Sequence, residues 1–162
     1  MKLKQYEVVT QPEFLKEPLE DILKRYKTIK KWAYILHDKD KNATPHYDIY
    51  LNFGDTGVES SEVAKWFGLQ ESQIEKVKGR AQDMLLYLIH GNDSQRHKYQ
   101  YSPDEVIANF DFKSELAKAK ILGNFDKYSY AQQLKFIKTL PKDEQVRAYK
   151  QLKDHWKLHC EY

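Results

Sequence analysis

Two histidines and three aspartates gather in one short stretch of the sequence, between residues 37 and 48. His37 and Asp40 lie in the segment HDKD, and His46 and Asp48 lie in the segment PHYDIYL. Imidazole nitrogens and carboxylate oxygens are groups with which proteins hold divalent metal ions. A cluster with this much oxygen favours Mg²⁺ or Mn²⁺. The alternative is a solvated polar turn whose carboxylates cap the backbone.

A predicted β-hairpin positions these residues. Residues 31–38 (KWAYILHD) and 45–53 (PHYDIYLNF) are rich in aromatic and β-branched side chains, which favour strands. Side chains alternate between the two faces of a strand, so His46 and Asp48 share a face. If the two strands pair across the loop between them, His37 comes beside both residues. Either Asp38 or Asp40 in the loop is then close enough to join the cluster.

The remaining patterns place this hairpin in a small sheet. Strand patterns cover residues 5–10 and 72–78, and helical patterns cover residues 13–29, 60–67 and 80–90. The order β-α-β-β-α-β-α predicts an α+β fold of the ferredoxin-like, split βαβ kind. We expect an antiparallel sheet with helices on one face and the other face free for a ligand. After residue 112, helical spacing predicts a C-terminal helical tail.

The predicted helix over residues 80–90 (RAQDMLLYLIH) has an apolar face and a polar stripe. Helical periodicity places Tyr87 in that stripe, together with Arg80, Asp83 and His90. Tyr87 therefore faces away from the core side of its own helix. The alternative, which the local pattern by itself favours, is that the Tyr87 ring packs in the core and only its hydroxyl reaches the surface. His90 is equally explained as a residue placed favourably at the helix C-terminus.

Composition excludes several classes of protein. The chain has 162 residues and one cysteine, and it contains no apolar run near the roughly 20 residues of a membrane helix. We therefore expect one compact core with a small appended element, without a disulfide framework, a signal peptide or a membrane partner. A cytoplasmic location fits. The net charge of +3 is too small to identify a nucleic-acid-binding protein by itself. The twelve tyrosines could stack on bases, and they are equally explained as ordinary strand residues.

Two segments are candidates for contacts with nucleic acid. The first offers phosphate partners and aromatic stacking surfaces through Arg96, His97, Lys98, Tyr99 and Tyr101. The second offers a basic path through Lys76, Lys78 and Arg80. The alternative interpretation of the first segment is a final edge strand of the sheet, with solvated charges.

The ordered motifs resemble the HUH endonuclease domain of rolling-circle plasmid replication initiators. The matching segments are HDKD, PHYDIYL, KGR…LLYLIHG (residues 78–91), HKYQY (residues 97–101) and NFDF (residues 109–112). The resemblance covers residues 1–112, which we predict to be the origin-nicking domain. Residues 113–162 are then a helical C-terminal extension.

The resemblance implies a role for each matching residue. A metal ion, Mn²⁺ or Mg²⁺, is expected at His37, Asp40, His46 and Asp48. Asp48 departs from the family pattern, which has a second histidine at that position, and its oxygen favours hard ions further. Tyr87, in a tyrosine-leucine-x-histidine motif, is the expected nucleophile, and the motif's histidine is His90, a candidate phosphate contact or partner of the metal ligands.

The predicted function is a metal-dependent, sequence-specific endonuclease that nicks and recloses a plasmid origin to start rolling-circle replication. The resemblance implies that the tyrosine remains joined to the 5′ phosphate while a free 3′-hydroxyl primes synthesis. The expected partner is single-stranded DNA of an origin hairpin, with host replication proteins and a second copy of the chain as further candidates. Two alternatives remain: a non-catalytic module that binds single-stranded nucleic acid, and a relaxase or single-strand transposase with the same chemistry.

Overall fold

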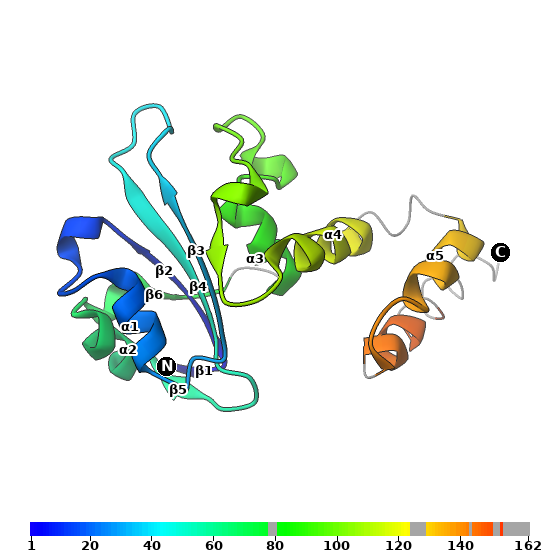
Figure 1. Ribbon diagram of the computed structural model, residues 1–162, viewed down its shortest axis with the longest axis horizontal. Helices are drawn as coiled ribbons and strands as arrows, with labels where there is room; N and C mark the ends of the chain where they lie inside the picture. Colours follow the sequence, from blue (N-terminus) through cyan, green and yellow to red (C-terminus); the bar gives the residue numbers. More distant parts are fainter. Residues whose placement is uncertain (78–80, 124–128, 143, 151–152, 154–162) are drawn as a thin grey trace. The chain divides into compact units, whose positions relative to one another are not determined.

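The computed structural model describes residues 1–77, 81–123, 129–142, 144–150 and 153. Its centre is a five-stranded antiparallel sheet with the spatial order β6-β2-β4-β3-β7 (Figure 1). The strands are β2 (Gln5–Thr10), β3 (Lys31–His37), β4 (His46–Asn52), β6 (Ile74–Lys76) and β7 (Ile107–Ala108). The predicted α+β, ferredoxin-like class is confirmed. A smaller sheet pairs β1 (Lys2–Leu3) with β5 (Val58–Glu59).

Two helices cover the first face of the large sheet, α1 (Leu19–Arg25) and α2 (Ser60–Phe67) (Figure 1). The helix predicted over residues 13–29 is shorter than expected. A 3₁₀ turn, η1 (Pro12–Phe14), comes first, and α1 begins only after Pro18. Proline disfavours helical geometry in the residue before it and fits the first turn of a helix, so it separates the two pieces.

The second face of the sheet is covered in part by α3 (Ala81–Leu88) and the start of α4 (Phe112–Gly123) (Figure 1). Met84, Leu85 and Leu88 of α3 are buried there against Ile35 and Tyr50. The face that we expected to be free is therefore partly covered. The reason is that β3 and β4 also present apolar side chains on this face, and α3 removes them from water.

The register of the central hairpin follows the predicted alternation. His37 is paired with His46, and Ile35 is paired with Asp48. Ile49 belongs to the first core and Tyr50 to the second, so neighbouring residues of β4 point to opposite faces. The polar residues of the candidate site thus lie on the face that α3 covers.

Short 3₁₀ turns connect the other elements: η2 (Glu71–Gln73), η3 (Asp93–Gln95) and η4 (Pro103–Glu105). The strand expected over residues 72–78 begins only after η2. Residues 96–101 form no strand, so the edge-strand interpretation of this segment is wrong. The edge position belongs to β7, which pairs with β3 through Ile107 and Ala108.

The chain divides into two compact units, Met1–Lys120 and Ile121–Tyr162. The described part of the second unit is helical, with α5 (Tyr130–Ile137) and helical residues 144–150. Ile137, Leu140 and Ala148 form its small core. The predicted helical tail is therefore confirmed. Among the described helices, none has the length and apolar character needed to cross a membrane.

Candidate functional site

The paired ends of β3 and β4 bring three of the predicted metal ligands together. His37 ends β3 and His46 begins β4, directly opposite each other. The Nδ1 atom of His37 lies 3.3 Å from Nε2 of His46 and 3.2 Å from Oδ2 of Asp48. The second carboxylate oxygen of Asp48 is 3.8 Å from the same His46 nitrogen. The side chain of His37 is fully buried, and those of the other two residues are largely buried.

Two backbone carbonyls determine which imidazole nitrogens of this cluster carry a lone pair in place of a hydrogen. Nε2 of His37 lies 2.7 Å from the carbonyl oxygen of Leu88, and Nδ1 of His46 lies 2.9 Å from that of Thr44. A carbonyl only accepts hydrogen bonds, so each of these nitrogens carries its ring hydrogen. The remaining nitrogens, Nδ1 of His37 and Nε2 of His46, then present lone pairs to each other and to Asp48. A positive charge between them relieves this repulsion.

The fourth predicted ligand, Asp40, lies in the loop after β3. His37, Asp40 and His46 each offer a ligand atom within 4.8 Å of the other two. The Oδ1 atom of Asp40 is buried and has no hydrogen-bond partner among the described residues. A buried carboxylate oxygen without a partner is unfavourable unless a cation or an unseen donor compensates it. The four residues therefore form a group that could hold a metal ion.

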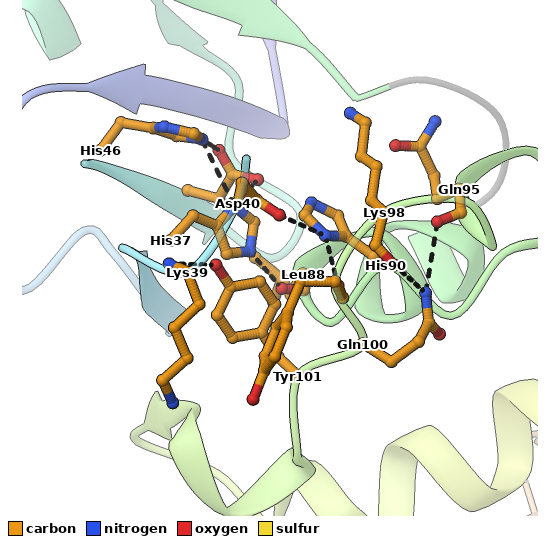
Figure 2. A network of polar contacts seen from close by, with 12 residues as sticks. His37, Lys39, Asp40, His46, Leu88, His90, Gln95, Lys98, Gln100 and Tyr101 are labelled. Carbon is orange, nitrogen blue, oxygen red and sulfur yellow. Dashed lines mark hydrogen bonds and ion pairs between the residues drawn. The ribbon is translucent and has the colours of Figure 1, made fainter. Parts of the chain in front are cut away.

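A fifth residue, His90, joins the cluster from the end of α3 (Figure 2). His37, Asp48 and His90 form a second group of ligand atoms within 4.8 Å of one another. Nδ1 of His90 lies 3.5 Å from Oδ1 of Asp40. The sequence offered two interpretations of His90: a residue placed favourably at the helix C-terminus, and a partner of the site. The first is incomplete, because the His90 ring is buried inside the site. The tyrosine-leucine-x-histidine motif was the sequence signal for the second interpretation.

Burial shifts the pKa values of the two most enclosed ligands. Burial lowers the pKa of His37, although the charge of Asp48 opposes this shift. Burial likewise raises the pKa of Asp48, and the nearby His37 and His46 oppose that shift. Both shifts have the same cause, the removal of a charged group from water. A neutral His37 has the lone pair that a metal ligand needs.

An open cavity of about 820 Å³ adjoins the cluster. Asp40, His46, Asp48 and His90 line it, and so does Tyr87 from α3. Tyr87 is half-buried, because part of its ring packs against the second core. The expected nucleophile and three of the four expected metal ligands thus share one cavity. Its walls also carry basic side chains from two segments, namely Lys39, Lys41, His97 and Lys98.

The residues predicted to contact DNA divide into several groups. Lys98 and Tyr99 line the cavity and are exposed. Arg96 is exposed but is not among the described residues that line the cavity. Lys78 and Arg80 lie outside the described residues.

Tyr101 differs from the expectation of a surface that stacks on bases. Its ring is only 4% exposed and stacks on His37, with ring centroids 4.6 Å apart. Its hydroxyl oxygen accepts a hydrogen bond from the backbone N–H of Lys39. Burial raises the pKa of Tyr101 to about 12. Tyr101 therefore packs against His37 in the interior, and an aromatic strand pattern could not reveal this packing.

Lys39 is a further residue of the cavity wall that the sequence analysis did not single out. Its ammonium group pairs with Glu105 and lies 5.6 Å from the ring centroid of Tyr99 and 5.9 Å from that of Tyr101. The motif HDKD contains Lys39, but nothing in the motif separates it from a solvated loop lysine. In the folded chain it places a positive charge at the cavity wall.

Comparison with known proteins identifies the family of the chain. The family model of the plasmid replication protein origin-binding domain matches residues 1–113. A replication protein of Onion yellows phytoplasma (strain OY-M) is 39% identical over 133 residues, and the match covers 71% of this chain and 34% of that protein. The chain thus spans about a third of the length of that relative. The chain belongs to the family of origin-binding domains of plasmid replication proteins.

Proposed function

We propose that this chain nicks one strand of a plasmid origin, with Tyr87 as the nucleophile and a divalent metal ion as cofactor. The observation that carries the proposal is that Tyr87 lines the same cavity as Asp40, His46 and Asp48. A hydroxyl group, a set of metal-binding side chains and lysines in one cavity suit attack on a phosphodiester. Membership of an origin-binding family supports DNA as the substrate.

The four residues that would hold the ion are His37, Asp40, His46 and Asp48. A bound Mn²⁺ or Mg²⁺ supplies Lewis-acid stabilisation of the charge that develops on the phosphate. Lys39 and Lys98 on the cavity wall would attract the DNA backbone toward Tyr87. Tyr101 and the carbonyl of Leu88 keep the His37 ring in place.

The proposed step exchanges one phosphodiester for another. The Tyr87 oxygen forms a bond to phosphorus while the bond from phosphorus to the 3′ oxygen breaks. The phenol gives up its proton to a base, and the leaving 3′ oxygen takes one up. The products are a 5′-phosphotyrosine and a free 3′-hydroxyl. Because the phosphotyrosine bond keeps the energy of the phosphodiester that was broken, the reverse reaction can reclose the strand.

A covalent-adduct experiment tests the proposal. The full chain is incubated with Mn²⁺ and a pool of single-stranded oligonucleotides of randomised sequence, and the products are separated by denaturing electrophoresis. We expect a DNA-linked protein band, and mass spectrometry of its digest should locate the nucleotide on the peptide containing Tyr87. Tyr87→Phe keeps the ring and should bind DNA without forming the adduct. Tyr99→Phe, which changes another tyrosine of the same cavity, should retain it.

The second candidate function is origin binding without cleavage, which the description of the matching family favours by itself. DNA binding by the wild-type chain without an adduct would support this candidate. A relaxase or single-strand transposase would form the same adduct. Matched reactions with an origin hairpin and with a transposon end separate these activities by which DNA is cleaved.

A further inference from the structure

His90 has an unusual backbone conformation for a histidine. It follows α3 (Ala81–Leu88) with a φ of 58°, in the left-handed region. Among the described residues, the other non-glycine residue with positive φ is Asn42, and asparagine tolerates this region well. A residue in this conformation persists only where its surroundings hold it, and such residues concentrate at functional sites. The contacts of the His90 side chain therefore decide whether it has a role.

The side chain is held from three sides (Figure 2). His90 is only 5% exposed, and its ring centroid lies 4.3 Å from that of His37 and 5.4 Å from that of Tyr101. Its Nδ1 atom is 3.0 Å from the carbonyl oxygen of Tyr99, which only accepts, so Nδ1 carries the hydrogen. The same nitrogen is 3.5 Å from Oδ1 of Asp40, close enough for electrostatic attraction but without a hydrogen bond. This is the Asp40 oxygen without a hydrogen-bond partner among the described residues.

We propose that His90 is a positioning residue that holds the Asp40 carboxylate in place for the metal ion. The proposal rests on the metal centre of the proposed function. Carboxylates that bind a metal are themselves oriented by neighbouring donors, and loss of such a donor weakens metal binding. Nδ1 of His90 lies 3.5 Å from Asp40 Oδ1, so its partly positive N–H group attracts the carboxylate, and the hydrogen bond to the Tyr99 carbonyl fixes the orientation of the ring.

The same arrangement ties the helix of Tyr87 to the metal ligands. Leu88, one residue after Tyr87, accepts the Nε2–H hydrogen bond of His37 through its carbonyl oxygen. His90, two residues further, packs its ring against the same imidazole at a tilt of 42°. The end of α3 is thus fixed to His37 at two points that flank Ile89. His90 acts on Asp40 and on the placement of α3, without touching the DNA itself.

The test measures Mn²⁺ binding to the full chain without DNA, by isothermal titration calorimetry. His90→Gly removes the ring and permits the positive φ, and we expect it to weaken Mn²⁺ affinity by about 10- to 100-fold. His90→Asn also tolerates this φ, and its amide N–H takes the place of Nδ1–H, so we expect affinity close to that of the wild type. The control is His97→Asn, which changes an exposed histidine of the same cavity and should leave affinity unchanged.

The outcomes separate the alternatives. If His90→Asn loses as much affinity as His90→Gly, the ring supplies a direct ligand through Nε2 and the positioning role is overturned. Wild-type affinity in His90→Gly also overturns it. Circular dichroism of the metal-free variants checks folding, and His90→Ala is the second ring-free variant if His90→Gly unfolds. If the wild-type chain itself binds no Mn²⁺, the metal centre of the proposed function fails, a result distinct from failure of the His90 role alone.

Discussion

At the residue scale, hydrogen-bond direction determines what the cluster can bind. The carbonyl oxygens of Leu88 and Thr44 accept hydrogen bonds from the ring N–H groups of His37 and His46. The other two ring nitrogens, 3.3 Å apart, then carry lone pairs beside Asp48. The same imidazoles with the opposite hydrogens would hydrogen-bond to each other or to the carboxylate. The backbone thus leaves these two nitrogens available to a cation, because the ring hydrogens are engaged elsewhere.

Asp48 gives a direct test of the ligand set. Asp48→His replaces an oxygen ligand by a nitrogen ligand, so we expect nicking to persist and metal preference to move toward Co²⁺ and Zn²⁺. Asp48→Ala removes the ligand, and since loss of a supporting partner alone costs 10- to 100-fold, we expect Mn²⁺ affinity to fall by at least about tenfold. Calorimetric titration of both variants measures this. Unchanged Mn²⁺ affinity in Asp48→Ala would mean that Asp48 is not a ligand.

At the scale of elements, α4 belongs to the core that supports the site. Leu116 and Ala119 are 3% and 2% exposed, and Phe112 and Leu116 lie in the same buried cluster as Leu88 of α3. The compact first unit accordingly extends to Lys120. A domain boundary at residue 112, which the motifs suggest, would cut α4 from the core against which it packs.

This packing predicts different stabilities for two shortened chains. A chain of residues 1–112 lacks Leu116, and removing a buried leucine side chain typically costs about 2–5 kcal/mol. We therefore expect residues 1–120 to unfold at a clearly higher urea concentration than residues 1–112, with the full chain as the reference. Circular dichroism during urea titration measures both midpoints. Equal midpoints would show that the α4 contacts do not stabilise the first unit.

At the scale of the whole molecule, basic side chains from separate segments meet at the candidate site. The net charge is only +3, yet Lys39, Lys41 and Lys98 all line the cavity that Tyr87 also lines. A modest total charge can thus attract a phosphate backbone locally, and salt should screen that attraction.

Salt dependence measures this contribution. If Lys98 neutralises one phosphate of single-stranded DNA, Lys98→Gln should reduce the slope of log affinity against log salt concentration by about 0.7. The control is Lys24→Gln, an exposed lysine of α1, which packs on the other face of the sheet. Its slope should equal that of the wild type. A slope unaffected by Lys98→Gln would remove Lys98 from the DNA path.

Metal removal tests the whole reaction. EDTA should abolish adduct formation, and excess Mn²⁺ or Mg²⁺ should restore it, because the phosphate then regains its charge stabilisation. His46→Ala should lose cleavage and keep most of its DNA affinity, since a metal ligand supplies few backbone contacts. Gel electrophoresis measures the adduct, and fluorescence anisotropy measures binding. Full nicking in the presence of EDTA would contradict the metal requirement.

The sequence by itself determined the order of the main strands and helices along the chain, the alternation in β4 and the membership of a replication-protein family. These rest on short-range patterns: a period of two in β4, a helical period in residues 80–90, and motifs in a fixed order. His37, His46 and Asp48 could be grouped in advance because one hairpin carries them all, and strand pairing fixes their neighbours.

Only the tertiary structure decided how α3 and the segment around Tyr101 complete the site. The hydrogen bond from His37 to Leu88 joins residues 51 positions apart, and no local period records such a contact. The burial of Tyr101 against His37, the left-handed turn at His90 and the covering of the second face by α3 all depend on that docking. Side chains with the same local pattern become surface, core or site according to what packs on them, and packing is a property of the folded chain.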